Sequence, residues 1–590
     1  MGFYILQIIM LLGGLALFLF GMDVMGKALE RTAGGKLQTI LSKMSSNVFL
    51  AIALGTVVTA VIQSSSATTV MLVGFVNSGI MTLQQTLGVI LGANIGTTVT
   101  AWILSLTSLK GDSFIIQLFK PATLAPIAAI IGIVLFMFVK DEKKKSIGTI
   151  LLGFMTLMTG MQLMGDAMEF LEDKAWFTNL MLSFSNPLLG ILFGTVLTAL
   201  IQSSSASVGI LQGLCVTGAV TFGSAIPIIL GQNIGTCVTA VMGAIGANRN
   251  AQRTALMHLL FKITGVTIFV VVFYGLGLFI DWEFLTEKTS AFDIAVVHTL
   301  YNVGAMFVLL PLRYPLLKLA CVILPDKKEP EKTVLLDERL LETPAVAVQQ
   351  AHEVAGRMAE SAAEAMKLAM DLTKHFDPKV LERIKELEDM TDHYQDALGA
   401  YLLKLSNKRL SVEDNRILNT LLYSIADIER IADHAVTVGK AGKEIDDKKV
   451  NFSDQAKAEL NVLMRAIADI LDRTVSTYKT FDYERARKIE AREQVVDALV
   501  KEIKSRHVRR LREGMCTVEY GFVLEDMLTA FERTADHCSN VAVETMQVAE
   551  GKLEAHEYLN ALKAGELQES VAFAEQFAKY KARYAFPEEQ

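Results

Sequence analysis

Residues 44–109 contain no charged side chain, yet the middle of this stretch reads "VIQSSSATT" at residues 61–69. About 20 apolar residues cross a bilayer, and each polar group left unpaired there costs several kcal/mol. The stretch therefore predicts a membrane-embedded chain whose glutamine and serines face protein rather than lipid. A second copy, "LIQSSSASV", follows at residues 200–208.

Charge divides the chain into two unlike parts. Residues 1–325 hold only 30 of the 119 charged residues, so we expect this part to be embedded in a membrane and the rest to be soluble. The soluble part is acidic, which argues against a nucleic-acid partner. The expected domains are a membrane domain at 1–325 (repeat one about 1–140, repeat two about 141–325), a linker at 326–344, a cytoplasmic helical domain at 345–550 and a helical tail at 551–590.

Apolar runs separated by charged loops predict seven membrane spans. Two further segments, 48–80 and 187–220, are broken by the serines into halves too short to cross alone. We expect each to be a re-entrant helical hairpin buried against protein. Basic loops at 27–46, 140–145 and 247–254 are cytoplasmic by the positive-inside rule, which places the carboxyl-terminal domain in the cytoplasm. The spans are expected near 3–26, 82–104, 122–139, 147–165, 222–246, 255–280 and 293–312.

The membrane part is an internal repeat. Residues 55–101 align with 194–240 without a gap, with 25 identities in 47 positions. On the expected spans, the first hairpin enters from inside and the second from outside, so the repeats have inverted topology. Transporters built this way bind substrate near the midplane, between the repeats. A second shared motif, "GANIGTT" (92–98) and "GQNIGTC" (231–237), places an asparagine between glycines that loosen a helix.

The matched polar clusters form a candidate binding site without fixed charge. Helix N-termini with free N–H groups attract anions, while hydroxyls and unwound carbonyls suit a hard cation such as sodium. Cations bound together with an anion would neutralise it, which predicts a symporter. The candidate residues are Gln63, Ser64, Ser65, Ser66, Asn94, Thr97, Thr98, Gln202, Ser203, Ser204, Ser205, Asn233 and Thr236.

Proton coupling is the weaker alternative, because the charge-free segments contain neither a carboxylate nor a histidine. Asp23 is the one acid near a span interior. We expect it at the headgroup level beside Lys27, with a part in a single ion site as the alternative. His258 and Lys262 follow Arg253 closely, and we expect a shallow or solvated position for both rather than a substrate role.

Paired QSSS and G-x-N-I-G-T motifs in two halves resemble the type II sodium–phosphate cotransporters, over roughly residues 1–325. The resemblance implies sodium-driven uptake of inorganic phosphate, and we expect the chain in the plasma (inner) membrane of a bacterium. It also implies that the hairpin tips and adjoining segments bind both phosphate and sodium. The second copy departs from the first, because Cys237 stands where the first copy has Thr98. The stoichiometry therefore stays open.

The carboxyl-terminal part is rich in Ala, Leu and Glu with helical periodicity, so we expect two antiparallel three-helix bundles at 345–445 and 453–550. The pattern E-R-x-x-D-H occurs at 429–434 and again at 532–537. Acids four residues apart face the same way on a helix. The candidate metal ligands are therefore Glu429, Asp433, Glu532 and Asp536, with surface acids paired to arginine as the alternative.

This doubled pattern in an all-helical domain resembles the PhoU family of phosphate regulators. The resemblance implies metal clusters, often of iron or zinc, on those four carboxylates, with Asp427 as a further candidate. It also implies regulation of the transporter. A homo-oligomer or a regulatory protein bound through this domain is the expected protein partner, beside phosphate, sodium and the lipid bilayer.

Three classes of function follow from these patterns. The first is a sodium-coupled phosphate symporter. The second is a transporter of the same fold that carries another oxyanion or exports phosphate. The third is a membrane-anchored phosphate-responsive regulator or a metal-dependent phosphohydrolase. The sequence contains no Walker-type GxxxxGK[ST] loop, and the carboxylates of the helical domain lack an obvious nucleophile or general base, so we expect no enzyme activity.

Overall fold

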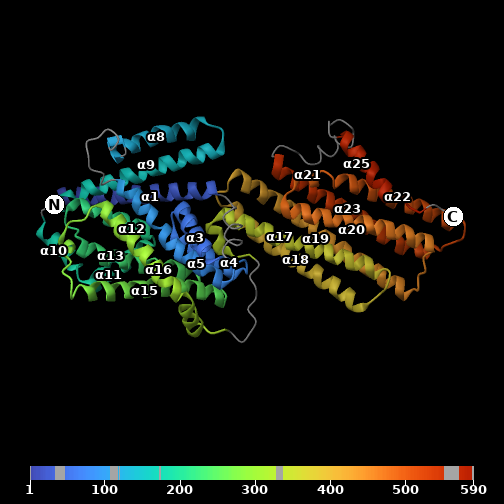
Figure 1. Ribbon diagram of the computed structural model, residues 1–590. Helices are drawn as coiled ribbons and strands as arrows, with labels where there is room; N and C mark the ends of the chain where they lie inside the picture. Colours follow the sequence, from blue (N-terminus) through green and yellow to red (C-terminus); the bar gives the residue numbers. More distant parts are fainter. Residues whose placement is uncertain are drawn as a thin grey trace. The chain divides into compact units, whose positions relative to one another are not determined.

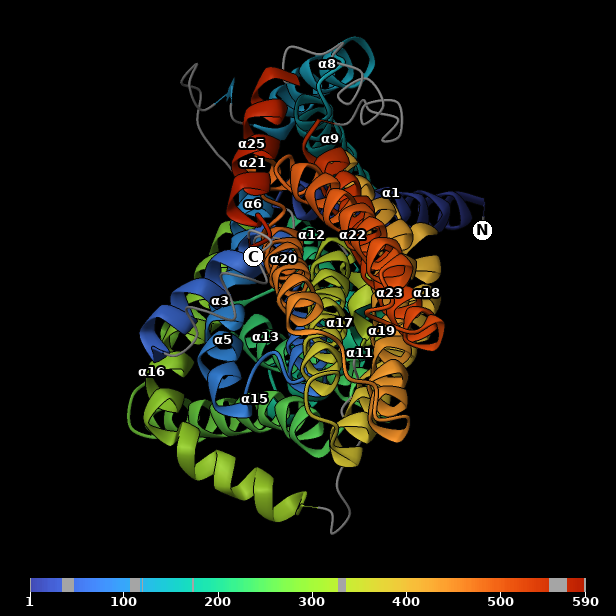
Figure 2. The same ribbon diagram turned by 90° about the vertical axis from the view of Figure 1, so that its right-hand side faces the viewer.

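The protein is described by a computed structural model over residues 2–33, 47–106, 117–118, 120–171, 174–326, 336–550 and 570–587. Parts of the predicted loop 27–46, linker 326–344 and tail 551–590 lie outside these residues. The chain divides into two compact units, Met1–Val346 and Ala347–Gln590. In the described ranges both consist of helices joined by turns and loops, with no strand beyond one isolated β-bridge, so the all-α prediction is confirmed (Figures 1 and 2).

Helices lie over all seven predicted spans of the first unit, but the helix over the predicted span 122–139 is among the shorter apolar helices. Six described helices are long and apolar enough to cross a membrane, or seven if the pair Ala175–Ser183 and Pro187–Ile201, bent by 99°, counts as one span. The helices are α1 (Gly2–Ala33), α3 (Val48–Ile62), α4 (Ser65–Asn77), α5 (Leu83–Gly96), α6 (Thr98–Ser105), α8 (Pro121–Phe138), α9 (Glu142–Met168), α10 (Ala175–Ser183), α11 (Pro187–Ile201), α12 (Ser204–Leu214), α13 (Phe222–Gly235), α14 (Cys237–Gly243), α15 (Arg249–Leu276) and α16 (Ala291–Ile323), with 3-10 turns η2 (Glu169–Leu171), η3 (Cys215–Thr217), η4 (Glu283–Thr286) and η5 (Glu338–Glu342).

The two halves of this unit repeat the same local structure. α3 and α11 each have 15 residues and an asparagine N-cap. Each ends at a glutamine in the left-handed region, Gln63 with φ 60° and Gln202 with φ 59°. The helix ends at this residue, and a short helix starts again two residues later. The prediction that the helix breaks at each QSSS run is thus met in both halves.

Glycines hold each hairpin against the following helix. α3 packs along α5, and α11 packs along α13. A Cβ on Gly92 would lie 2.0 Å from the carbonyl oxygen of Ile52, and one on Gly231 would lie 2.1 Å from that of Ile191. In the first copy, the span formed by α5 and α6 is interrupted at a single residue, Thr97. These glycines therefore allow close packing between helices. The expectation from the sequence was instead that they loosen their own helix.

The second unit consists of long, roughly parallel helices (Figure 1). α19 packs along both α18 and α23, and α23 packs against α20 and α22. The tail helix α25 lies on α22, where the Arg492 guanidinium stacks 4.0 Å from the ring centre of Tyr580. The helices are α17 (Pro344–Leu372), α18 (Pro378–Ser406), α19 (Val412–Asp447), α20 (Asp454–Thr480), α21 (Tyr483–Ala486), α22 (Glu490–Arg512), α23 (Val518–Glu550) and α25 (Ser570–Arg583).

Candidate functional site

The tips of the two hairpins meet through Thr100 on α6. Its hydroxyl donates to Gln63 Oε1 at 2.8 Å, and it accepts from the Ser205 hydroxyl at 3.4 Å. All three side chains are buried. Residues from both QSSS motifs are therefore brought together inside the first unit. Sequence reasoning missed Thr100, although its hydroxyl lies one helical turn after Thr97 in "TTVT" and so shares its face.

Each tip starts a helix whose first turn is capped by a serine. Ser64 Oγ accepts from the Ala67 amide at 3.1 Å, and Ser203 Oγ accepts from the Ala206 amide at 3.2 Å. The next serines, Ser65 and Ser204, are buried, and their hydroxyls make no hydrogen bond to the part of the chain that the structure describes. These hydroxyls, with the positive ends of α4 and α12, are suited to an anion.

The two tips are not equivalent. Gln63 is 7 % exposed and held by Thr100, whereas its counterpart Gln202 is exposed. Ser66 is half-buried, while its counterpart Ser205 is buried. The first hairpin therefore places its glutamine inside the site, and the second places its third serine there.

The threonines of the second motif direct their protons into their own helices. The hydroxyls of Thr97, Thr98 and Thr236 donate to the carbonyls of Ala93, Ile95 and Gln232, at 2.9, 2.8 and 2.9 Å. A hydroxyl whose proton is engaged still offers its oxygen lone pairs. These buried oxygens can accordingly serve as ligands to a hard cation.

The asparagines of the second motif differ between the halves. Asn233 Oδ1 accepts from the Lys262 ammonium at 2.6 Å, and its amide donates to the Ile229 carbonyl. Asn94 Oδ1 is buried and has no partner among the described residues. Asn233 thus binds the ammonium of a lysine of the same protein. Asn94 has a side-chain oxygen without a hydrogen-bond partner among the described residues.

The expected solvated position of His258 and Lys262 is wrong. The two side chains are 1 % and 6 % exposed, and neither ring nitrogen of His258 has a partner within the described ranges. Their helix α15 packs against α4, α5, α13 and α14, so its first half is enclosed by protein. Asp23, by contrast, is exposed and pairs with Lys27 at 2.8 Å, as expected.

The segment before α17 is fastened to the first hairpin. Asp337 is buried and accepts from Asn77 at the end of α4, at 2.8 Å, and pairs with Arg339 at 2.9 Å. Leu340 packs on Gly74, where an added Cβ would lie 2.7 Å from Leu340 Cδ2. The chain that leads toward the second unit therefore touches the hairpin helix whose other end carries the serines.

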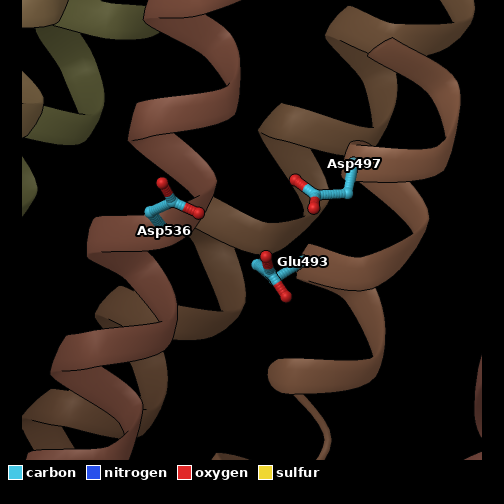
Figure 3. Close-up of side chains that lie close together, drawn as sticks. All are labelled: Glu493, Asp497 and Asp536. Carbon is cyan, nitrogen blue, oxygen red and sulfur yellow. The ribbon is translucent and has the colours of Figure 1, made fainter. Parts of the chain in front are cut away.

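In the second unit, three acids from two helices face one another (Figure 3). Glu493 and Asp497 on α22 and Asp536 on α23 each offer a carboxylate oxygen within 4.8 Å of the others. Burial raises the pKa of Asp536, and the neighbouring Asp497 raises it further. Mutual repulsion of this kind is relieved by a bound cation, and an all-oxygen donor set suits a hard metal ion.

This three-acid group contains one of the four predicted ligands, Asp536. Glu532 lies 3.8 Å from the Lys504 ammonium instead. Glu493 and Asp497 were not among the predicted ligands because they lack the E-R-x-x-D-H pattern, although they show the same four-residue spacing.

In the first bundle, burial raises the pKa of Glu429, and nearby Asp433 and Asp392 raise it further. Glu388 and Asp392 on α18 have the same four-residue spacing as Glu493 and Asp497. In the first bundle, acids of α18 and α19 therefore lie close enough to influence one another. Asp427 lies elsewhere, because it accepts from Asn540 and pairs with His537 at 2.6 Å.

Comparisons with known proteins agree with this architecture. Residues 17–166 and 157–308 each match the Na+/Pi-cotransporter family, and residues 355–441 and 460–545 each match the PhoU domain. "Putative inorganic phosphate export protein YjbB" of Escherichia coli is 26% identical over 86% of this chain and 91% of its own length. "Uncharacterized protein YqeW" of Bacillus subtilis is 29% identical over 52% of this chain and 96% of its own length.

A third relative aligns with a smaller part of the chain. "Sodium-dependent phosphate transport protein 2B" of Homo sapiens is 34% identical over 20% of this chain and 17% of its own length. The family match covers both halves of the membrane unit, and the PhoU match covers both helical bundles. The chain therefore belongs to the Na+/Pi-cotransporter family and carries two PhoU domains after its membrane unit.

Proposed function

We propose that the membrane unit carries inorganic phosphate together with sodium across the bilayer, and binds both between the two hairpin tips. The observation that carries this proposal is the hydrogen-bonded connection from Gln63 through Thr100 to Ser205. A purely structural role would not require matched polar tips that meet in a buried place, because each unpaired polar group there is costly.

The phosphate oxygens would lie against the hydroxyls of Ser65 and Ser204 and the first turns of α4 and α12. Both helices begin there, so their positive ends favour an anion. Sodium would bind the oxygens of Asn94, Thr97 and Thr98 in the first half. Each ion then offsets the charge of the other, which couples their binding.

Inverted topology of the two repeats would supply the transport cycle. If the first hairpin enters from inside and the second from outside, a rocking motion of one repeat against the other exposes the tips to each side in turn. The unequal exposure of Gln63 and Gln202 is consistent with one such state.

The PhoU-like unit would regulate this transport and bind metal at the acids of α22 and α23. The family resemblance implies iron or zinc as the metal. A physical route for regulation is the segment Asp337–Thr343, which holds the end of α4 and continues directly into α17. A shift of α17 would pull on the hairpin that carries Ser65.

Export of phosphate is the second candidate, and it concerns the direction of flux rather than the site. A relative that spans most of this chain is named a phosphate export protein. Coupled carriers run in either direction when the gradients are reversed, so the same site serves both candidates.

Counterflow of labelled phosphate in proteoliposomes tests the proposed substrate. With sodium on both sides, unlabelled phosphate inside the vesicles should drive rapid entry of labelled phosphate, and Ser65→Ala should abolish it. Arsenate should compete because it has the shape and charge of phosphate, whereas sulfate should compete weakly. Equal competition by sulfate, or exchange unaffected by Ser65→Ala, would contradict the proposed substrate and site.

A further inference from the structure

Two repeat-related asparagines lie in different electrostatic surroundings. Asn94 and Asn233 occupy the same position in the two copies of G-x-N-I-G-T, and both are buried. The side-chain oxygen of Asn233 holds the Lys262 ammonium at 2.6 Å, whereas that of Asn94 has no partner in the described part of the chain. A buried amide oxygen without a partner is costly. A cation bound at Asn94 would give its oxygen the positively charged partner that Lys262 gives to Asn233.

The residues that follow the two motifs, Thr98 and Cys237, also differ in their ability to bind a cation. Thr98, next to the first motif, is a buried threonine whose hydroxyl proton is engaged with Ile95 and whose lone pairs remain. Its counterpart Cys237 is a buried thiol. Sulfur is a soft donor and a poor ligand for a hard cation. The half that holds the lysine therefore lacks an oxygen ligand that the other half has.

Lys262 is also a buried positive charge. It is 6 % exposed, and no carboxylate pairs with it among the residues that the structure describes. A buried cation without a counter-ion is strongly unfavourable, unless an anion is to bind nearby. The same requirement applies to a sodium ion placed beside phosphate.

We propose that the Lys262 ammonium is a tethered substitute for a coupling cation in the second half, so that only the Asn94 half binds a sodium ion that travels. This inference rests on the proposed function and concerns its stoichiometry. Ammonium and sodium each bring one positive charge to an amide oxygen, but the ammonium remains with the protein. Each phosphate would therefore cross with one sodium fewer than two equivalent half-sites would require.

The test is the ratio of labelled sodium to labelled phosphate carried by the full chain in proteoliposomes. The double variant Lys262→Met/Cys237→Thr rebuilds the ligands of the first half in the second. We expect its ratio to rise by about one sodium per phosphate, and the Hill coefficient for sodium to rise by about one. Lys262→Arg keeps the charge and should keep the wild-type ratio. Lys288→Met, an exposed lysine of the same unit, is the matched control.

A second measurement keeps the proposal testable if the double variant does not fold. Sodium should raise the melting temperature of the purified chain without phosphate. Asn94→Asp adds a charge at the travelling site and should lower the half-saturating sodium concentration at least tenfold. In Asn233→Asp, the new carboxylate would pair with Lys262. This variant should change the half-saturating sodium concentration less than twofold. The reverse pattern would overturn the proposal.

The outcomes separate this inference from the proposed function. If the wild type shows sodium-dependent flux but the double variant keeps the wild-type ratio, Lys262 does not replace a sodium ion. Loss of phosphate affinity alone would instead make Lys262 a direct phosphate ligand and overturn the inference. If the wild-type flux and melting temperature do not respond to sodium, the proposed coupling fails and this inference fails with it.

Discussion

Thr100 and Gln63 lie 37 residues apart in the chain, yet the threonine hydroxyl donates to Gln63 Oε1 at 2.8 Å in the buried centre of the membrane unit. Gln63 ends α3 in the left-handed region, and its side-chain amide joins α3 to α6, because Nε2 donates to the Ala60 carbonyl of α3 while Oε1 accepts from Thr100. Because Thr100 also accepts from Ser205, one hydroxyl joins the two halves. The first prediction follows from that position.

Thr100→Val keeps the shape of the side chain but removes the hydroxyl. It leaves Gln63 Oε1 without its donor, and we expect the unit to lose about 1 to 3 kcal/mol of stability and phosphate flux to fall at least tenfold. Thermal melting and labelled-phosphate uptake measure the two effects. Thr239→Val is the matched control, because that hydroxyl donates to its own helix. Equal flux in both variants would contradict the role of Thr100.

Ser65→Ala and Ser204→Ala each remove a hydroxyl that makes no hydrogen bond within the described ranges. Folding should therefore be nearly unchanged, with a melting temperature close to that of the wild type. Phosphate transport should be abolished, because the hydroxyl would bind the anion. Ser183→Ala, an exposed serine bonded to its own helix, should transport normally. Full transport in both tip variants would show that the site lies elsewhere.

Asp337→Asn tests the attachment of the segment before α17 to the first hairpin. The change removes the charge that pairs with Arg339 and weakens the bond from Asn77. Since Arg339 is partly exposed, we expect a loss of about 2 kcal/mol, less than for a fully buried pair, and faster proteolysis within 336–343. Asp281→Asn, an exposed acid of the same unit, is the control. Unchanged proteolysis would show that the segment is held by its other contacts.

The Glu544 carboxyl makes stability depend on pH. Burial raises its pKa from 4.5 to about 7, and Asp427 contributes. The folded state therefore binds a proton more readily than the unfolded state between about pH 4.5 and 7, so this group lowers stability as pH rises through that window. Glu544→Gln should stabilise the chain at pH 8 by about 1 to 2 kcal/mol after solvent screening.

His434 acts in the opposite sense. Burial lowers its pKa from 6.5 to about 4, and the stacked His537 lowers it further. The unfolded state then binds the extra proton, so stability is lost as pH falls from about 6.5 to about 4. Denaturant unfolding at pH 5 and pH 8 separates the two groups. A Glu544→Gln variant with the wild-type difference between these pH values would contradict the assignment.

Asp536→Asn and Glu493→Gln test the three-acid group as a metal site. Each removes one carboxylate charge from the group, so we expect metal affinity to fall at least tenfold. Metal content of the purified chain, after equilibrium dialysis against iron, zinc or manganese, measures this. Glu382→Gln removes a surface acid that pairs with Lys385 and should retain the metal. Equal metal content in all variants would exclude this group.

Much of the membrane unit could be predicted from the sequence because its signals are local. The two QSSS runs interrupt apolar segments, and the matched Gln63 and Gln202 break their helices in the same way. Repetition strengthened the prediction, since a polar run that occurs twice at the same spacing is hard to explain by packing alone. The Asn caps and glycine contacts repeat as well.

Contacts between distant segments could not be predicted in this way. The position of Ser205 beside Thr100 depends on how α12 packs on α6, and no local pattern contains that information. Lys262 was misplaced for the same reason. A lysine near a basic loop usually reaches the membrane surface, but α15 is covered in part by α4 and α5, which lie far from it in the chain.

The three-acid group of the second unit was predicted only in part, because the pattern E-R-x-x-D-H contains Asp536 alone among its members. The physical requirement for such a group is acids four residues apart on one helix that face an acid of the next helix. Glu493 and Asp497 meet this requirement without the arginine. Only the packing of α22 on α23 shows that they face Asp536.

Sodium-driven accumulation of labelled phosphate in proteoliposomes of the full chain tests the central claim most directly. An inward sodium gradient should drive phosphate above its equilibrium level, an outward gradient should drive it out, and potassium at equal pH should do neither. Flux that is indifferent to sodium in both directions would contradict the coupling of phosphate to a cation at Asn94, Thr97 and Thr98.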